Sequence, residues 1–294
     1  MSPTPRHPRI LVIRLGALGD FVQSSGPFAA IRAHHPGARI TLLTTRPFAD
    51  LARRSPWFDE VWPDGRPSWR APGALLALAR RLRGVGFDRV YDLQTSSRSS
   101  RYRWLVGRGV EWSGIAPGCS HPHANPRRDF MHTVERQREQ LQMAGITEFP
   151  APALDWLEAD LSRFDLPSRF GLLIPGASPL RPLKRWPAER FAGLAAAAGF
   201  PVAVLGGPAE TDIATRILAA ALARRADWAV GNDTGPTHLV ATAGCPTLAL
   251  FGEDSDPALC APRGPAARVL RHIPLAELPL ETVQVALATL PARG

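Results

Sequence analysis

The stretch from Val230 to Gly252, VGNDTGPTHLVATAGCPTLALFG, has the pattern of a strand, a sharp turn, a helix and a second strand. Gly231-Asn232-Asp233 is a turn signature that follows a short apolar run. Thr234 is suited to cap a helix, and Pro236 fits the first helical turn, where a missing N–H costs nothing. The apolar residues 247–251 then predict a buried strand. The stretch therefore predicts an α/β unit.

A helix that opens directly after a strand directs free N–H groups and a partial positive charge at the carboxyl edge of the sheet. Open α/β sheets bind their ligands at that edge. Asp233, Thr234, Gly235 and His238 are therefore placed where the phosphates or the ribose of a nucleotide would lie. The bare pattern, taken alone, favours an ordinary strand–helix–strand unit in which Asp233 and Thr234 only cap the helix.

The composition fits a globular protein with a substantial core. The chain has 294 residues, of which 45% are hydrophobic and 21% charged, enough for one large or two ordinary domains. The opening MSPTPRHPRI lacks the pattern of a signal peptide, and no apolar run is long enough to cross a bilayer, so we expect a cytoplasmic protein. Cys119, Cys245 and Cys260 are far apart, which suggests neither disulfides nor a zinc site.

The charge balance leaves several partners open. A net charge of +9 is compatible with nucleic acid, an anionic membrane surface or an anionic substrate. No interleaving of aromatic and basic residues favours nucleic acid. Arg98, Arg101, Arg103 and Arg108 gather around one predicted helix, where they suit a phosphorylated lipid acceptor or an anionic membrane face. A solvated charged helix face is the alternative.

Lys184 is the only lysine in the sequence, and all the other Lys and Arg positions are arginine. In a chain that favours arginine so strongly, a single lysine suggests a position that requires a compact ammonium group rather than a planar guanidinium. It lies in a loop between a predicted strand at 170–174 and a helix that begins at Pro187. Chance survival on a surface loop is the alternative, and the neighbouring motifs favour a functional role.

Strands and helices alternate along both halves of the chain, which predicts parallel sheets covered on both faces. In the first half we expect strands at 9–15, 39–45, 60–63, 88–94 and 110–113 and helices at 21–33, 47–54, 74–83, 97–105 and 129–144. In the second half we expect strands at 170–174, 201–205, 228–230, 247–251 and 268–270, with a final helix at 278–290. We place a first domain at 1–150, a proline-spaced linker at 150–167 and a second domain at 151–277, with the final helix packing back on the first domain.

The first predicted strand runs into Gly16-Ala-Leu-Gly19-Asp20, which differs from the G-x-G-x-x-G dinucleotide fingerprint. Its two glycines allow a close approach to the backbone. Asp20 stands at a helix start, where it is either a cap or a base aimed into a cleft, and the local pattern favours the cap. The pair His121 and His123 suggests a metal, but two prolines and the lack of a third ligand favour a loop.

Distinctive polar residues follow the predicted strands at their carboxyl ends. Two doubly wound domains that face each other would bring these residues to one cleft, suited to a nucleotide-linked substrate and to the exclusion of water. They are Asp20, Gln94, Ser178 to Lys184, Glu210 and Asp233 to His238.

Three motifs in this order resemble glycosyltransferase family 9, the ADP-heptose–lipopolysaccharide heptosyltransferases and their relatives. They are RLGALGD at 14–20, KRWP at 184–187 and GNDTGPTHL at 231–239, and the resemblance runs from Ile10 to about Gly252. It implies a GT-B fold with two Rossmann-like domains on either side of a cleft. It also implies an inverting transfer of a sugar, with ADP-heptose or another nucleotide sugar as donor, to a lipid-linked core oligosaccharide, without a metal or other cofactor.

The resemblance implies donor-side roles for individual residues. Lys184 matches the cation that balances the departing diphosphate. Thr234 and Gly235 match backbone donors to that diphosphate, with Asp233 and His238 beside them. Glu210 matches a carboxylate that holds the ribose hydroxyls, and Ser178 lies in a phosphate-facing loop.

On the acceptor side, Asp20 matches the general base that takes the proton from the attacking hydroxyl. Gly19, Gln94 and Arg98 are expected beside it. The resemblance, rather than the local pattern, moves Asp20 from a cap to a base.

The chain departs from the family in one region. Between Glu210 and Asp233 there is room for one helix only, whereas family members usually have a further strand and helix that help to enclose the base. We therefore expect a shortened second domain whose sheet lacks a strand. This favours an alternative in which a degenerate member binds nucleotide, glycan or a partner protein without turnover, while the retained Asp20, Lys184 and Asp233 favour an enzyme.

Two other enzyme classes are disfavoured by missing motifs. A nicotinamide-dependent oxidoreductase would be expected to carry G-x-G-x-x-G after a strand. A P-loop NTPase would carry Gly-Lys-Ser/Thr, and Lys184 is followed by arginine.

Overall fold

The structure, a computed structural model, describes residues 6–206 and 213–293. The chain forms two compact units: Met1–Gly16 with Ser24–Ala151, and Ala17–Gln23 with Pro152–Gly294. A short segment near the start of the chain therefore belongs to the second unit and interrupts the first. No helix in the described part of the chain is long and apolar enough to cross a membrane.

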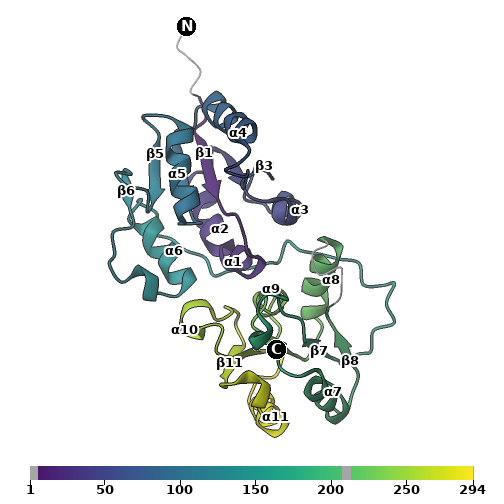
Figure 1. The fold of residues 1–294 in the computed structure, drawn as a ribbon. Coiled ribbons are helices and arrows are strands. Elements are labelled where there is room, and N and C mark those ends of the chain that lie inside the picture. The colour runs from purple at the N-terminus through teal and green to yellow at the C-terminus, as the bar shows by residue number, and fades with distance from the viewer. Residues whose placement is uncertain (1–5, 207–212, 294) are drawn as a thin grey trace. The chain divides into compact units, whose positions relative to one another are not determined.

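The first unit contains a six-stranded sheet in the order β3-β2-β1-β4-β5-β6, with every pair parallel (Figure 1). In its register Ile10 lies opposite Ile40 on one side and Arg89 on the other. Its strands are β1 (Arg9–Ile13), β2 (Arg39–Leu43), β3 (Glu60–Trp62), β4 (Arg89–Asp92), β5 (Glu111–Gly114) and β6 (His121–Pro122). Its helices are α2 (Ser25–His34), α3 (Arg46–Arg54), α4 (Pro72–Val85), α5 (Ser97–Val106), η1 (Arg128–Phe130) and α6 (Thr133–Gln142).

The central strands of this sheet are apolar on both faces because helices cover both. Leu11, Val12 and Ile13 are fully buried, and so is Val90 in the neighbouring strand. Continuous apolar runs of this kind are typical of parallel strands. Tyr102 on α5 is also buried and donates its hydroxyl to the Gly65 carbonyl at 2.7 Å, so its polar atom is satisfied.

The second unit contains a five-stranded parallel sheet in the order β11-β10-β9-β7-β8. Its strands are β7 (Gly171–Ile174), β8 (Val202–Val204), β9 (Trp228–Asn232), β10 (Thr247–Phe251) and β11 (Ala267–Arg271). Its helices are α1 (Leu18–Gln23), η2 (Pro182–Lys184), α7 (Ala188–Ala197), α8 (Ile213–Ala223), α9 (Gly235–Thr242), α10 (Pro257–Cys260), η3 (Leu275–Glu277) and α11 (Leu280–Ala288).

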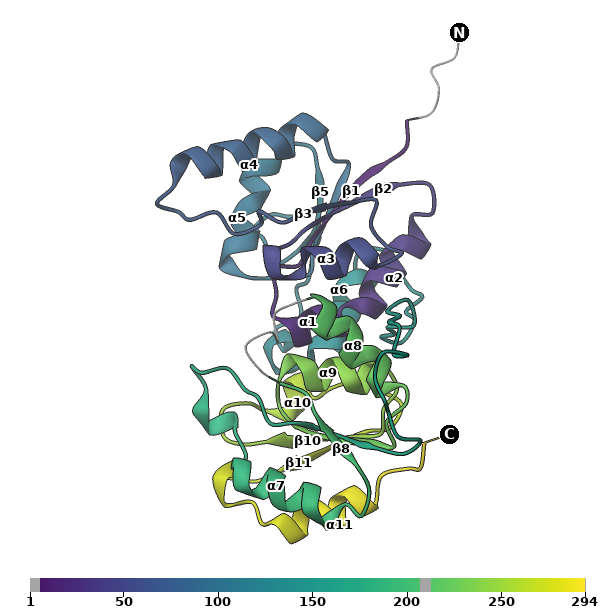
Figure 2. The ribbon, with the colours of Figure 1, turned by 90° about the vertical axis from the view of Figure 1, so that its right-hand side faces the viewer.

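Helices cover both faces of the second sheet. Figure 2 shows α8 and α9 over one face and α7 and α11 over the other. The first layer joins Val240 and Leu222 to Leu172 and Ile174 of β7, and the second joins Trp186 and Val283 to β9 and β10. The two layers give this unit a closed core.

The strand orders of the two sheets differ at one edge. In the first sheet, β2 lies beside β1, and β3 lies outside β2 at the edge. In the second sheet, β8 lies beside β7 and is itself the edge strand among the residues described. Val204 at this edge is 63% exposed. The chain passes from β8 through α8 directly to β9. This agrees with the short connection expected between Glu210 and Asp233.

Several expected elements differ in detail from the structure. The helix expected at 21–33 is divided into α1 and α2, because Pro27 in the first turn of α2 has no N–H with which to continue a single helix. The helix expected at 129–144 is η1 followed by α6. The loop expected around His121 forms β6, which pairs with β5.

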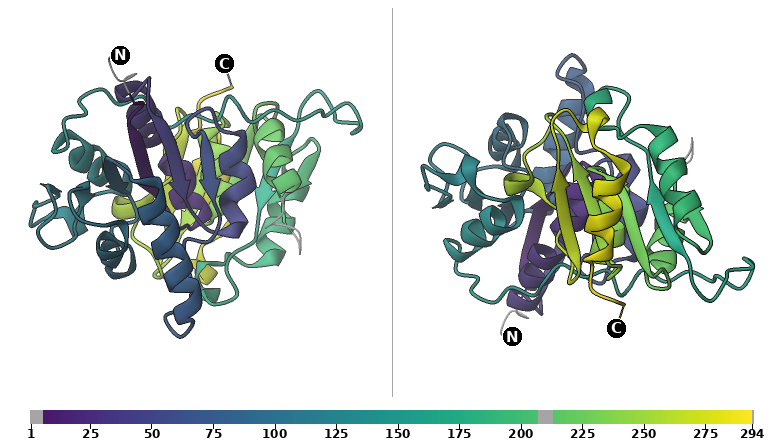
Figure 3. Two further views of the ribbon diagram at one scale, coloured as in Figure 1. Left: turned by 90° about the horizontal axis from the view of Figure 1, so that it is seen from above. Right: turned by 90° about the horizontal axis from the view of Figure 1, so that it is seen from below.

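The final helix, α11, lies in the second unit, so the expectation that it packs on the first domain is wrong. Val283 is fully buried in the second core, and the right-hand view of Figure 3 shows this yellow helix across the strands. The segment expected as a linker has no helix or strand, but it is anchored. Arg224 donates to the carbonyls of Leu154 and Leu157, both at 2.6 Å, and both leucines are buried.

Candidate functional site

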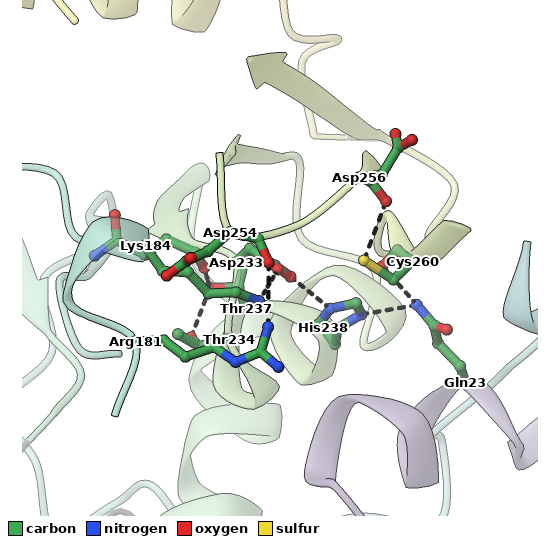
Figure 4. Close-up of polar contacts among 11 residues, drawn as sticks. Gln23, Arg181, Lys184, Asp233, Thr234, Thr237, His238, Asp254, Asp256 and Cys260 are labelled. Carbon is green, nitrogen blue, oxygen red and sulfur yellow. Dashed lines mark hydrogen bonds and ion pairs between the residues drawn. The ribbon is translucent and has the colours of Figure 1, made fainter. Parts of the chain in front are cut away.

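Three charged or ionisable side chains of the second unit meet just beyond the carboxyl end of β9 (Figure 4). The Lys184 ammonium forms an ion pair with Oδ2 of Asp233. Nε2 of His238 lies 3.3 Å from the other oxygen, Oδ1. The Lys184 side chain is 15% exposed and that of Asp233 only 5%, so this is a largely buried cluster.

The cluster has an ionised carboxylate at its centre. Burial by itself would raise the pKa of Asp233, but hydrogen bonds from His238 and Lys184 outweigh it and hold that pKa at about 2. Asp233 is therefore charged at neutral pH. It engages Lys184 with one oxygen, and an ammonium group has three N–H donors, so Lys184 keeps donors for a second anionic partner.

Buried contacts fix the loop that carries Lys184. Trp186 is 2% exposed, and its indole N–H donates to the Leu278 carbonyl at 2.9 Å. Its backbone N–H donates to Oδ1 of Asn232 at 3.0 Å, and Asn232 Nδ2 donates to the Pro175 carbonyl at 2.8 Å. Within KRWP the tryptophan is therefore an anchor, and the lysine two residues before it is held against β9.

The N-terminus of α9 is not closed by the side chains expected to cap it. Thr234 occupies the N-cap position but makes no side-chain cap, and its hydroxyl lies 3.3 Å from that of Thr237. Thr237 donates to the Asn232 carbonyl at 2.6 Å. The Asp233 carboxylate faces Lys184 and His238. The interpretation in which Asp233 and Thr234 only cap the helix is therefore wrong for this structure.

Helix α1 supplies the far end of the cluster. Gln23 is 1% exposed, and its Nε2 lies 3.0 Å from the Ala261 carbonyl, 3.2 Å from the Cys260 carbonyl and 2.9 Å from Nδ1 of His238 (Figure 4). The two carbonyls can only accept, so they fix the amide with its NH₂ group facing them and facing the histidine. Nδ1 of His238 is then the acceptor, and its ring carries the proton on Nε2, where it donates to Asp233.

Glycines allow α1 and α9 to pack closely. A Cβ atom added at Gly19 would lie 2.8 Å from Cδ2 of His238, and one added at Gly235 would lie 2.6 Å from Cβ of Leu18. The close approach predicted for the RLGALGD motif is therefore the approach of the His238 ring at Gly19. At Gly16, the other glycine of the motif, the ring of Phe48 takes that place.

Asp20 lies in the first turn of α1 and is half-buried. Its Oδ2 accepts a hydrogen bond from the Ala17 backbone N–H at 3.1 Å. This is the contact that the cap interpretation predicts, and it also fixes the direction of the carboxylate. Its role as a base stays a prediction.

Ser178, Gln94 and Arg98 make contacts of their own, with partners other than Lys184, Asp233 and His238. Ser178 is exposed and its hydroxyl accepts from the Leu180 N–H at 3.3 Å, while Glu210 lies outside the described residues. Gln94 and Arg98 belong to the first unit, at the carboxyl end of β4 and the start of α5. Oε1 of Gln94 accepts from the Leu15 N–H at 2.8 Å. Arg98 donates to the Pro67 carbonyl at 2.9 Å.

Sequence reasoning missed three buried polar residues. Gln23 and Asn232 support His238 and the Lys184 loop, and only their polarity beside apolar neighbours marks them in the sequence. The third is Asp92, fully buried at the end of β4, where burial raises its pKa to about 7 despite hydrogen bonds from the Gln94 and Thr95 N–H groups. An isolated acid at the end of an apolar strand is the only signal that could have found it.

Comparison with known proteins gives a consistent result. Residues 75–220 and 218–280 match the family model described as glycosyltransferase family 9 (heptosyltransferase). Lipopolysaccharide heptosyltransferase 2 of Escherichia coli K12 is 26% identical over 311 aligned positions, which cover 90% of this chain and 88% of the relative.

Solved structures show the same fold. The E. coli ADP-heptose lps heptosyltransferase II has a TM-score of 0.72 at 23% identity and covers 95% of this chain and 98% of its own. The E. coli heptosyltransferase WaaC, solved with ADP, has a TM-score of 0.67 at 20% identity and covers 95% and 99%. The predicted GT-B fold with two Rossmann-like units is confirmed.

Proposed function

The chain belongs to glycosyltransferase family 9, and on that premise we propose that it is an inverting transferase acting in the synthesis of lipopolysaccharide or a related glycan. It would move a heptose or related sugar from a nucleotide diphosphate to a lipid-linked core acceptor. The observation that carries the proposal is the buried cluster of Lys184, Asp233 and His238 beside the open N-terminus of α9. The names of the related heptosyltransferases, one of them solved with ADP, support an adenosine donor.

The donor-side chemistry follows from the charge that develops on the leaving group. When the bond from the anomeric carbon to the diphosphate breaks, negative charge collects on phosphate oxygens. The Lys184 ammonium and the first N–H groups of α9 are donors fixed in advance of that charge. Asp233 keeps Lys184 in place through one carboxylate oxygen, and His238 binds the other oxygen of the same carboxylate. Ser178 and Glu210 are proposed to contact the phosphates and the ribose hydroxyls.

The acceptor-side chemistry requires a base. We assign this to Asp20, whose carboxylate would take the proton of the acceptor hydroxyl as the hydroxyl oxygen attacks the anomeric carbon from the face opposite the diphosphate. One carbon–oxygen bond forms, one breaks, and the anomeric configuration inverts. The bond from the Ala17 N–H holds the carboxylate ready for this transfer. Gly19, Gln94 and Arg98 are proposed on the acceptor side, and the reaction as proposed uses no metal or other cofactor.

The site of action is part of the proposal. A lipid-linked acceptor and a nucleotide-sugar donor meet at the cytoplasmic face of the inner membrane, and we propose that the enzyme works there.

The donor is tested first by thermal-shift titration with ADP, UDP, GDP and dTDP. A nucleotide that binds the native state raises the melting temperature, and the stabilisation grows with the logarithm of the nucleotide concentration once that concentration exceeds the dissociation constant. We expect ADP to stabilise the wild type and Asp20→Ala, and the shift to shrink in Lys184→Ala. If a different nucleotide stabilises the wild type and Asp20→Ala but stabilises Lys184→Ala less, the donor carries that nucleotide instead of ADP. The assignment of Lys184 to the donor site would then be unchanged.

Turnover is then measured with ADP-heptose and a deacylated core acceptor. We expect Asp20→Ala to lower the rate by about 10²–10⁴-fold, the usual contribution of a positioned base. The matched control is Asp160→Ala, which removes an exposed carboxylate that also accepts from a backbone N–H nearby, Ser162 at 2.8 Å. Full activity of Asp20→Ala would refute the base assignment.

A second candidate function rests on the edge of the second sheet, where β8 is the last strand among the described residues. If the second sheet lacks the strand and helix that help to enclose the nucleobase of the donor, the chain binds nucleotide or glycan without turnover. Stabilisation by a nucleotide, with no product from any matching nucleotide sugar under conditions where an active relative turns over, would favour this binder over the transferase.

A further inference from the structure

The first unit contains a hollow of about 600 Å³ that the proposed reaction does not use. It lies at the C-terminal ends of α4 and α5 and along the loop that leads into β5, which is the amino edge of the sheet. Gln94 and Arg98 mark the opposite, carboxyl edge. The residues that line the hollow are Arg83, Arg103, Trp104, Gly107, Arg108, Gly109 and Val110.

Two of the guanidinium groups around the hollow, those of Arg83 and Arg103, are held by neutral partners. Arg83 donates to the Trp104 carbonyl at 3.2 Å, and Arg103 donates to the carbonyls of Pro117 and Gly118 at 3.1 and 2.6 Å. A carbonyl fixes the direction of a guanidinium without cancelling its charge. No carboxylate is among the lining residues, and Glu111, the next residue along the chain, pairs with Arg89.

Six arginines elsewhere in the same unit differ from this arrangement, because their guanidinium groups pair with carboxylates. Those pairs are Arg6 with Asp88, Arg32 with Asp59, Arg39 with Glu60, Arg53 with Asp50, Arg81 with Glu60 and Asp64, and Arg89 with Glu111. The hollow is therefore a local concentration of positive charge, whereas a mixed charged surface would alternate the two signs.

An exposed aromatic ring stands beside these cations. The Trp104 side chain, on the outer face of α5, is 69% exposed. Arg108 follows between Gly107 and Gly109, which have φ angles of 115° and 81°. Those left-handed angles suit glycine and turn the chain sharply on both sides of Arg108. Cations that flank an exposed tryptophan match the headgroup level of a bilayer, where indole rings and basic side chains both bind favourably.

We propose that this surface, Arg83, Arg103, Trp104 and Arg108, docks the protein on an anionic lipid bilayer. The arginines would bind headgroup phosphates, for which the planar guanidinium is well shaped, and Trp104 would enter the interfacial layer. The proposal separates Arg103 and Arg108 from Arg98 and Arg101, whose guanidinium groups lie over Trp69, at 4.8 and 5.5 Å from its ring centre.

Vesicle flotation of the full chain tests the proposal. The vesicles contain phosphatidylcholine alone, or equal parts of phosphatidylcholine and phosphatidylglycerol. We expect binding to the anionic vesicles only, weakened by salt, with a partition coefficient about fivefold lower for each arginine removed in Arg103→Gln and Arg108→Gln. The matched control is Arg54→Gln, which removes an exposed arginine at the end of α3 in the same unit. Circular dichroism and the melting temperature confirm that each variant is folded.

A second readout reports the position of the ring. Brominated phosphatidylglycerol quenches tryptophan fluorescence at the interface, and we expect Trp104→Phe to abolish the quenching. Three results would overturn the proposal: equal binding of the wild type and a variant that carries both Arg103→Gln and Arg108→Gln, equal binding to neutral vesicles, or quenching that survives Trp104→Phe. Binding to inorganic phosphate or to an oligonucleotide that exceeds binding to the vesicles, and is lost in the same arginine variants, would assign the surface to a soluble ligand instead.

Discussion

Substitution of Asp233 by asparagine removes the charge at the centre of the site and leaves its shape nearly unchanged. The pKa of Asp233 falls from an ordinary value of 3.8 to about 2 in the folded chain. Each pKa unit corresponds to about 1.4 kcal/mol, so the ionised carboxylate contributes about 2.5 kcal/mol to the stability of the second unit. Its side chain is only 5% exposed, so solvent screens this contribution little.

The direction of the pKa shift of Asp233 determines how its contribution to stability changes with pH. Because the folded pKa is the lower one, the contribution is fully present above the unfolded pKa, near 4, and is lost as the pH falls towards 2. About half of it should be gone at pH 3. The Asp233→Asn variant cannot titrate at this position, so its stability should fall less steeply over the same interval.

Native-state hydrogen exchange in urea, read on peptides from β9 and β10, measures the stability of the second unit within the full chain. We expect the difference between wild type and Asp233→Asn to shrink by more than 1 kcal/mol between pH 5 and pH 3. Asp256→Asn is the matched control, because Asp256 is an exposed N-cap of α10 and asparagine caps equally well. A difference that stays constant between pH 5 and pH 3 would show that Asp233 is not held ionised by Lys184 and His238.

Three further substitutions test other parts of the structure. Gln23→Met should release the tautomer of His238, so ¹⁵N shifts of its ring should move from a single Nε2–H form towards a mixture; unchanged shifts would contradict the role of the amide. Gly235→Ala places a Cβ 2.6 Å from that of Leu18, and should lower the unfolding free energy by about 1–3 kcal/mol, read by denaturation; a neutral result would show that α1 yields freely. Burial raises the pKa of Asp92 to about 7, so the first unit should lose stability as the pH rises from about 4 to 7, and Asp92→Asn should flatten that dependence in exchange measurements on β1 and β4.

The sequence was informative wherever structure leaves a local pattern. Strands buried on both faces produce continuous apolar runs, which is why residues 247–251 predicted β10 correctly. The lone lysine was a compositional signal, and the structure places the Lys184 ammonium in an ion pair with Asp233, while its role toward a donor stays a prediction. The helix after Asp233 was also a local signal and is present as α9, but Gly231 and Asn232 belong to β9, so the chain bends only at Asp233 and Thr234, later than expected.

Contacts between distant parts of the chain left no such pattern. Gln23 meets His238 across 215 positions, and nothing near Gln23 announces that partner. The division of the expected 21–33 helix into two pieces follows from Pro27, whose missing N–H is a local signal that the sequence does contain. The packing of α11 on the second unit could not be predicted, since an amphipathic helix at the end of a chain suits either core equally.

The assignment of α1 to the second unit has a consequence for how the chain is made. During translation Ala17–Gln23 emerges before nearly everything it packs against, because its partners Cys260, Ala261 and the α9 helix come more than two hundred positions later. The first unit can fold around this segment as soon as its own residues have emerged, but the second unit stays unfinished until almost the whole chain has emerged. Completion of the Lys184–Asp233–His238 cluster therefore depends on both ends of the polypeptide, and a nascent or C-terminally truncated chain would have one folded unit and an unassembled cluster.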